Sequence, residues 1–382
     1  MSATYSDVTT LAWVVPNAKQ EFQLQHILLD NPRDDEVVVE MKYSGICHTD
    51  IVLQQGGIPI LEYPAVLGHE GAGVIKAIGS KVQDETLRVG DFVLLSTNSC
   101  QKCRLCKRGY PVECIEGPRL HFSGLRSDGT SSARDSGTGA TIRSHCFGQS
   151  SFQRLSYVHE TCVVRHPCPA DDAAKLAPMG CSYQTGAGTI MNILNPQPDN
   201  TLIIFGLGAV GMAALMAARA LDVAQIIAVD IQDSKLSLAK ELGAMHIVNP
   251  KDHSDDLVAK LRGLTDGEGC DYAVDCTGVP TIIETMLECL AMRGTAATVG
   301  VAPEKADIRI RPLQYLLGSK RYLGCQGGDS VPQEFIPKLV EMNRRGQFPI
   351  ERIVKVYDYR DLPRALDDLR QGAVVKPVIQ WY

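Results

Sequence analysis

The chain has 382 residues, of which 45% are hydrophobic, and a formal net charge of −6. A mildly acidic balance argues against nucleic acid as a partner, and no apolar run is long enough to span a bilayer. Thirteen cysteines are an odd number, which disfavours a disulfide framework in so long a chain. The first residues lack the basic and apolar segments of a secretory leader. We therefore expect a cytoplasmic protein of two domains, each able to bury its own core.

Short β-type runs dominate residues 1–180. Glycine and proline separate them, and few long helical periods occur; examples are residues 36–42, 73–78 and 91–95. This pattern predicts a mainly β domain. The stretch Ser127–Thr141 is rich in serine, glycine and threonine and is expected to form a mobile surface loop.

Four cysteines in this half follow the spacing C-x2-C-x2-C-x7-C, namely Cys100, Cys103, Cys106 and Cys114. A tetrahedral Zn²⁺ site needs four sulfurs that short loops bring together, and this spacing supplies them locally. Lysines and arginines between the cysteines would offset the excess negative charge. Because all four metal positions are filled, residues 98–116 are predicted to form a structural zinc lobe. Free or disulfide-paired cysteines are the alternative.

A glycine-rich turn begins the next part of the chain. Thr201–Phe205 is a short apolar run typical of a buried parallel strand, Gly206-Leu-Gly208-Ala209-Val210-Gly211 follows at once, and residues 212–220 have a helical composition. Strand, tight turn and helix together are the dinucleotide-binding fingerprint. Gly206 permits the turn, Gly208 lets the backbone approach a pyrophosphate, and Gly211 lets helix and strand pack closely.

The following strand, residues 225–230, ends in Asp230. An acid at this place is expected to bond the adenosine ribose hydroxyls. Because a carboxylate there repels a 2′-phosphate, the sequence predicts NAD in preference to NADP. Lys235 lies just beyond, and it either reaches the ribose or is a solvated helix residue.

Strands and helices continue to alternate after Asp230. Strand-like runs occur at residues 246–249, 272–276 and 295–300, and helical stretches occur at residues 234–242 and 280–292. This alternation predicts a doubly wound parallel sheet, and therefore an α/β fold. Residues 329–382 return to mixed character, so we expect the chain to re-enter the first domain.

Cys47, His69 and Cys181 are candidates for a second metal site. They lie far apart in the sequence, so their spacing alone does not decide the matter. Taken singly, each has an ordinary interpretation as a buried thiol or a hydrogen-bonded histidine.

The chain resembles the zinc-dependent medium-chain alcohol dehydrogenases over nearly its whole length. The motifs that carry the resemblance occur in the family's order: Cys47-His-Thr-Asp50, Gly68-His-Glu-Gly71, the four-cysteine lobe, Gly180-Cys181, Gly206–Gly211 and Asp230. The resemblance implies a mainly β, GroES-like catalytic domain at residues 1–190, a Rossmann domain at 191–328, and a return to the catalytic domain at 329–382. It also implies an active site in the cleft between the domains and a homodimer or homotetramer.

The resemblance assigns roles to individual residues. It implies that Cys47, His69 and Cys181 hold a catalytic zinc whose fourth position takes water or alcohol. Thr49 is implied to bond the substrate oxygen, Asp50 to orient His69, and Glu70 to lie behind the metal. The residues implied to contact the cofactor are His48, Thr185, Gly206, Gly208, Ala209, Val210, Gly211, Asp230, Lys235, Val301 and Lys376.

The implied reaction needs two zinc ions per chain and NAD(H). Zinc lowers the pKa of the alcohol, and a hydride passes between the alcohol carbon and the nicotinamide. One position departs from the family. Many relatives carry a histidine as the outer base of the proton relay where this chain has Val52, so the outer relay is left unassigned.

The expected substrate is a small molecule, a bulky primary alcohol of the aryl or allylic kind, or its aldehyde. Ser96 stands where many ethanol-active relatives have a large aromatic residue. The segments Cys146–Phe152, Gln184–Gly188 and Gly328–Ile336 resemble the aryl-alcohol branch, although they can also mark ancestry alone. An aldehyde intermediate of secondary metabolism fits equally well. Two other functions stay open: a reductase of the same fold that acts on an activated C=C bond without zinc, and a non-catalytic protein that binds NAD and zinc.

Overall fold

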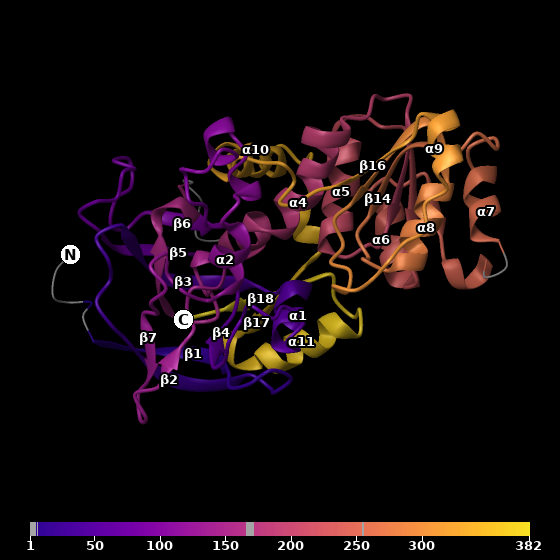
Figure 1. The fold of residues 1–382 in the computed structure, drawn as a ribbon. Coiled ribbons are helices and arrows are strands. Elements are labelled where there is room, and N and C mark those ends of the chain that lie inside the picture. The colour runs from indigo at the N-terminus through magenta and orange to yellow at the C-terminus, as the bar shows by residue number, and fades with distance from the viewer. Residues whose placement is uncertain (1–4, 6, 166–171, 254–255) are drawn as a thin grey trace. The chain divides into compact units, whose positions relative to one another are not determined.

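The computed structural model describes residue 5 and residues 7–165, 172–253 and 256–382 (Figure 1). The chain forms two compact units. The first unit takes in the described residues up to Cys181 and residues 331–340 and 354–382; the second takes in residues 182–330 and 341–353. We keep the limits 1–190, 191–328 and 329–382 as a proposal for the domains.

Two sheets make up the first unit among its described residues. One has the strand order β4-β1-β2-β7-β8, and the other has the order β10-β6-β5-β3-β18-β17, with β9 also paired to β3. The strands are β1 (Val8–Val15), β2 (Gln23–Leu29), β3 (Glu36–Gly45), β4 (Ala65–Val66), β5 (Gly71–Ile78), β6 (Phe92–Leu95), β7 (Ala133–Asp135), β8 (Thr141–Ile142), β9 (Leu155–His159), β10 (Val163–Arg165), β17 (Val354–Asp358) and β18 (Lys376–Gln380).

Strand β3 shows why these segments form a sheet. Its run of β-branched residues, Val37, Val38 and Val39, is fully buried, as expected for a strand whose two faces are covered. β18 pairs with β3 in antiparallel register, with Val378 opposite Gly45, and with β17 in parallel register. The C-terminal strand therefore lies inside the sheet that the N-terminal half begins.

Helices of the first unit are short and connect the strands. They are α1 (His48–Gln54), α2 (Gly117–Phe122), α3 (Ala173–Leu176) and α11 (Leu362–Arg370), and α10 (Pro332–Arg344) continues from the first unit into the second. The hydrogen bond from Trp13 Nε1 to the carbonyl of Tyr359, 2.8 Å long, ties β1 to the returning segment. Among the described residues, none of the helices has the length and apolar character that crossing a bilayer requires.

The second unit is built on a sheet in which every strand pair is parallel, with the order β13-β12-β11-β14-β15-β16. Its strands are β11 (Thr201–Phe205), β12 (Gln225–Val229), β13 (His246–Val248), β14 (Cys270–Asp275), β15 (Leu290–Thr298) and β16 (Arg321–Gly324). Its helices are α4 (Ser182–Gly188), α5 (Ala209–Ala220), α6 (Asp233–Glu241), α7 (Leu257–Gly263), α8 (Pro280–Glu288) and α9 (Pro312–Gly318). The predicted doubly wound parallel sheet is thus confirmed.

Two local expectations differ from the structure. The helix expected over residues 280–292 ends at Glu288, and β15 begins at Leu290, because residues 295–298 join a parallel ladder with β14 that extends back to this point. The segment Ser127–Thr141 is not simply a surface loop, since it contains β7, which pairs with β2.

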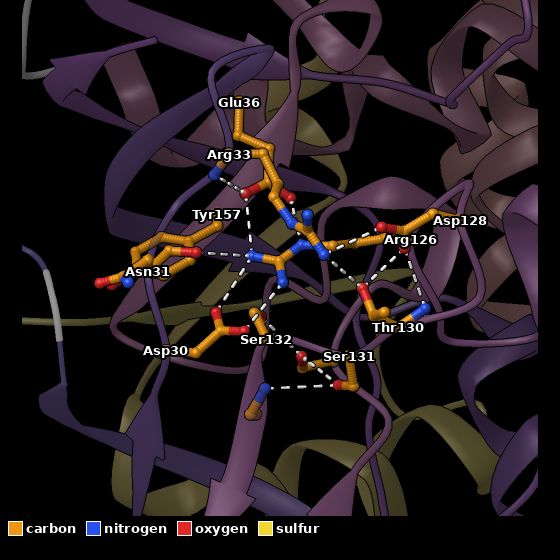
Figure 2. Close-up of polar contacts among 12 residues, drawn as sticks. Asp30, Asn31, Arg33, Glu36, Arg126, Asp128, Thr130, Ser131, Ser132 and Tyr157 are labelled. Atoms are coloured by element: carbon orange, nitrogen blue, oxygen red, sulfur yellow. Dashed lines mark hydrogen bonds and ion pairs between the residues drawn. The ribbon is translucent and has the colours of Figure 1, made fainter. Parts of the chain in front are cut away.

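An ion-pair network around Arg126, which directly precedes this segment, fastens it to the end of β2 and the start of β3 (Figure 2). The Arg126 guanidinium donates to both carboxylate oxygens of Glu36, at 2.7 and 3.0 Å, and to both of Asp30, at 3.0 and 3.1 Å. The side chains of Arg126 and Glu36 are 5% and 4% exposed, whereas that of Asp30 is 37% exposed. One cation therefore ties the segment to the end of β2 and the start of β3.

Candidate metal centres and dinucleotide site

Four side chains of the first unit gather into one candidate metal centre. Cys47, His69, Glu70 and Cys181 each offer a ligand atom, and all these atoms lie within 4.8 Å of one another. Cys47 precedes α1, His69 and Glu70 precede β5, and Cys181 precedes α4. The structure thus brings together residues that are up to 134 positions apart, which their spacing could not establish.

The imidazole of His69 is oriented by Asp50. Nδ1 lies 3.1 Å from Asp50 Oδ1, and Asp50 also accepts hydrogen bonds from the backbone N–H groups of Cys47 and Gly68, at 2.9 and 3.1 Å. Both side chains are fully buried. His69 Nε2 is buried and has no hydrogen-bond partner among the described residues. A carboxylate that fixes the Nδ1 proton leaves the Nε2 lone pair for a metal, so this donor set fits one.

A hydrogen bond joins the two cysteines of this centre and shifts their pKa values in opposite directions. The hydrogen bond with Cys181 lowers the pKa of Cys47 well below its ordinary value, although burial acts in the opposite direction. The same hydrogen bond, together with burial, raises the pKa of Cys181. A divalent cation at this centre would favour both sulfurs as thiolates and displace their protons.

Glu70 and Lys376 form a buried ion pair beside the centre. Lys376 Nζ lies 2.9 and 3.1 Å from the carboxylate oxygens of Glu70 and donates to the carbonyl of Ile46 at 3.0 Å; Lys376 is 2% exposed. Burial raises the pKa of Glu70, and Lys376 opposes this rise. Lys376 is thus held by the Glu70 carboxylate. The contact of Lys376 with a diphosphate stays a prediction.

The remaining predicted residues of the first unit lie on or near α1. The Thr49 hydroxyl is 3.7 Å from Cys47 Sγ, and His48 is exposed. Val52 is half-buried and cannot carry a proton. Ser96, expected beside the substrate, is fully buried and donates to the carbonyl of Gly180 at 2.8 Å, so its observed contact holds the residue before Cys181.

The four-cysteine lobe forms a second candidate centre, with its sulfurs also within 4.8 Å of one another. The Sγ atoms of Cys103 and Cys106 are 3.5 Å apart, and those of Cys100 and Cys106 are 4.0 Å apart. A tetrahedral site with metal–sulfur bonds of about 2.3 Å places its sulfurs about 3.8 Å apart, so the lobe fits zinc. A hydrogen bond from the Cys106 backbone is the main cause that lowers the pKa of Cys103 to about 6, and it favours the thiolate.

The glycine-rich turn of the second unit joins β11 to α5. Gly206 has φ +87°, and a Cβ there would come within 2.8 Å of Thr277 Cγ2; a Cβ on Gly211 would collide with the Gly206 carbonyl. Gly208 has open space around its Cα and precedes the first residues of the helix, Ala209 and Val210. The shape of the turn therefore requires glycine at positions 206 and 211, and the space beside Gly208 is open.

Asp230 follows β12 and faces this turn. Its carboxylate accepts hydrogen bonds from the backbone N–H groups of Leu207, at 2.6 Å, and Gln232, at 2.9 Å. Lys235 is half-buried on α6, and Val301 is 53% exposed after β15. Thr185 lies on α4, where its carbonyl accepts from the Thr189 hydroxyl at 2.7 Å. The structure fixes Asp230 beside the glycines, and the cofactor contacts of all these residues remain predictions.

The known proteins that this chain matches agree with the metal centres and the glycine-rich turn described above. Residues 33–167 match the alcohol dehydrogenase GroES-like domain, and residues 209–343 match the zinc-binding dehydrogenase family. The chain is 34% identical to a geraniol dehydrogenase of Castellaniella defragrans over 99% of its own length and 100% of that protein. The chain belongs to the zinc-dependent medium-chain alcohol dehydrogenase family. This confirms the resemblance on which the assignment of roles rests.

Solved structures of the family have the same fold. An alcohol dehydrogenase zinc-binding domain protein from Burkholderia ambifaria is 38% identical, with a TM-score of 0.92 over 98% of this chain and 99% of that one. The benzyl alcohol dehydrogenase of Acinetobacter calcoaceticus is 37% identical, with a TM-score of 0.91 over 98% and 100%. This protein is therefore a zinc-dependent alcohol dehydrogenase.

Sequence reasoning missed one residue that holds the backbone next to His69. The Gln149 side chain donates to the carbonyls of His69 and Ser96, both at 2.9 Å, and accepts from the Gly71 N–H at 3.0 Å. Gln149 is fully buried. The only signal in the sequence was its place in the segment Cys146–Phe152, which we considered solely as a marker of the aryl-alcohol branch.

Proposed function

We propose that this dehydrogenase interconverts a bulky primary alcohol, of the aryl or allylic kind, and its aldehyde with NAD(H). The observation that carries the proposal is the centre formed by Cys47, His69 and Cys181, in which the only unpartnered polar atom of His69 is Nε2. Two relatives support the substrate class, since one is a geraniol dehydrogenase and another a benzyl alcohol dehydrogenase. Both alcohols carry the hydroxyl on a carbon next to an unsaturated group.

The side chains of the centre have separate tasks in this proposal. When bound, zinc supplies a Lewis acid at the alcohol oxygen and NAD accepts the hydride. Asp50 keeps the proton on His69 Nδ1, so that Nε2 is free to act as a ligand. Thr49, beside Cys47, offers a hydroxyl to the substrate oxygen, and Glu70 is held by Lys376 at 2.9 Å behind the ligands. The four cysteines of the lobe are assigned to a second, structural zinc.

NAD is the proposed cofactor in preference to NADP. Asp230 places a carboxylate beside the glycine-rich turn, and two backbone N–H groups fix its orientation. A 2′-phosphate on the ribose would meet this negative charge. The remaining proposed cofactor contacts are those of His48, Thr185, Gly206, Gly208, Ala209, Val210, Gly211, Lys235, Val301 and Lys376.

We also propose that the protein is a cytoplasmic homo-oligomer. None of the cysteines that the structure describes forms a disulfide, which suits a reducing compartment. β16 is the last strand in the order of the parallel sheet, and α9 before it exposes Leu313, Leu316 and Leu317 by 65%, 74% and 67%. An apolar patch next to an open strand edge is suited to association with a second copy.

Turnover at 340 nm on a panel of alcohols and aldehydes tests the proposal, with NAD or NADP and with or without a zinc chelator. We expect activity that depends on NAD, is strongest on benzyl, cinnamyl or geranyl substrates, and is lost with the chelator. Cys47→Ser should abolish turnover while NADH binding remains. Cys289→Ser, which changes a buried thiol of the second unit outside both centres, is the matched control. Full activity of Cys47→Ser, or turnover that survives removal of the metal, would contradict the proposed centre.

A further inference from the structure

Three aromatic rings lie face to face in the first unit, and His69 is the last of them. The ring centroids of His69 and Phe147 are 4.3 Å apart with an interplanar angle of 20°, and those of Phe147 and His121 are 5.0 Å apart at 8°. His69 and His121 are each 1% exposed, and Phe147 is 8% exposed. The face of a proposed metal ligand is therefore covered by a ring that is itself covered by a second imidazole.

Both ends of the four-cysteine lobe reach this stack. Asn98, just before Cys100, donates its backbone N–H to the carbonyl of Phe147 at 3.2 Å. His121 lies on α2, which begins three residues after Cys114, and its Nε2 bonds to the carbonyl of Asn98 at 2.7 Å. The segments that enter and leave the lobe are thus joined to each other, and both contact Phe147.

The backbone of Phe147 adopts a conformation that its sequence does not favour. Its φ is +53°, in the left-handed region that side chains other than glycine rarely occupy. Such a conformation persists where neighbouring contacts fix it. Here they do: Gln149 bonds the His69 carbonyl and the Gly71 N–H, and the Ser150 hydroxyl donates to the carbonyl of Val66 at 2.7 Å. The turn directs the Phe147 ring onto the imidazole.

We propose that Phe147 is a positioning residue for His69, and that the cysteine lobe, through Asn98 and His121, holds it in place. Asp50 fixes only the Nδ1 edge of the imidazole, so the ring plane needs a second contact, which the face of Phe147 supplies. The inference rests on the proposed metal centre. Its consequence is that damage to the stack weakens metal binding at Cys47, His69 and Cys181 although no ligand has changed. Loss of contacts that orient a ligand typically lowers metal affinity by about 10–100-fold.

Cobalt substitution tests the role of Phe147 without relying on turnover. The full-length protein is loaded with Co²⁺, and the affinity of each centre is measured by competition with a chelator, since a centre with one nitrogen and two sulfur ligands absorbs differently from one with four sulfurs. We expect Phe147→Leu to bind cobalt at the His69 centre about 10–100-fold more weakly, with the lobe unchanged, and Phe147→Tyr to restore the affinity. The control is Phe22→Leu, the same change in the same hydrophobic core, where the ring contacts Phe152 instead. Equal affinities for Phe147→Leu and Phe22→Leu would overturn the positioning role.

A second pair of variants tests the link to the lobe. His121→Leu removes a ring from the stack and should weaken cobalt binding at the His69 centre, whereas His121→Phe retains the ring and should bind more tightly than His121→Leu. If Phe147→Leu does not fold, this pair decides the proposal. Equal cobalt affinity for His121→Leu and the unchanged protein would overturn the link. Failure of the proposed function is distinct, because the unchanged protein would then lack the spectrum of a centre with nitrogen and sulfur ligands.

Discussion

Replacing Arg126 with methionine should destabilise the first unit far more than replacing Arg134, whose side chain is 42% exposed. Arg126 lies between Asp30 and Glu36 and donates hydrogen bonds to both (Figure 2). Methionine retains much of the apolar stem, so the change removes mainly the charge and its hydrogen bonds. Glu36, whose side chain is 4% exposed, would then keep a buried carboxylate without its cation.

The expected loss of unfolding free energy follows from these exposures. Removing one partner of a buried ion pair costs about 3–5 kcal/mol. Asp30 is 37% exposed and can regain water, and Glu36 keeps a hydrogen bond from the Arg33 N–H at 2.7 Å. The lower end, about 3 kcal/mol, is therefore expected. A double variant with Glu36→Gln removes the stranded charge and should recover at least about 1 kcal/mol of this loss.

Tryptophan fluorescence during denaturant unfolding isolates the first unit. The chain has two tryptophans, Trp13 and Trp381, and both are buried in the hydrophobic core of that unit. The control is Arg134→Met, because Arg134 pairs with Asp7 at the surface and should contribute less than about 1 kcal/mol. The reasoning is refuted if Arg126→Met costs no more than Arg134→Met, or if the double variant is no more stable than Arg126→Met.

Three further predictions concern the lobe, the cofactor and acid stability. Cys103→Ala should lower the metal content by one ion per chain and destabilise the first unit by several kcal/mol, since structural zinc contributes folding energy directly; atomic absorption and the tryptophan assay check this. Asp230→Gly should lower the preference for NAD over NADP by about 10-fold or more, since a charge-assisted hydrogen bond contributes about 1.5–3 kcal/mol, and an unchanged ratio of kcat/KM would contradict the ribose contact. Burial, and next the charge of Arg126, lower the pKa of His145 from its ordinary 6.5 to about 3. The unfolded chain therefore binds a proton that the folded protein excludes, so His145 destabilises the fold as pH falls below about 6.5, by about 2 kcal/mol at pH 5. His145→Gln should reduce the acid sensitivity of unfolding by this amount between pH 7 and pH 5, and an identical pH profile would count against it.

The parts of the fold that local sequence determines were predictable. The strands β3, β5, β6 and β11 coincide with runs of apolar, β-branched residues, and the turn after β11 is specified by its own glycines. The end of α8 was not predictable from local sequence. The residues Leu290–Met292 are apolar enough for a helix, and they form a strand only because β15 pairs with β14. Serine and glycine between Ser127 and Thr141 indicated a loop, whereas the pairing of β7 with β2 depends on residues about a hundred positions away.

The residues of the candidate site also fall into two groups, those that local sequence specifies and those that only the fold brings together. The cysteine lobe and the glycine-rich turn are local motifs, so their residues could be named from spacing. The centre at His69 depended on a family resemblance, since its ligands come from separate segments. Two of its contacts left no pattern at all: the ion pair of Glu70 with Lys376, 306 positions apart, and the stacking of Phe147 on His69. Neither periodicity nor composition records a contact between rings or charges that only the folded chain brings together.

The place of β18 inside the first unit's sheet has a consequence for synthesis on the ribosome. β3, which leads directly to Cys47, has β18 as a neighbour, and residues 376–380 are translated long after residues 36–45. Every strand of the parallel sheet in the second unit has left the ribosome before then. The second unit can therefore become stable first, while the sheet that contains β3 stays incomplete until β18 has been translated. During translation, the sheet of the first unit therefore exposes apolar strands for longer than the parallel sheet of the second unit does.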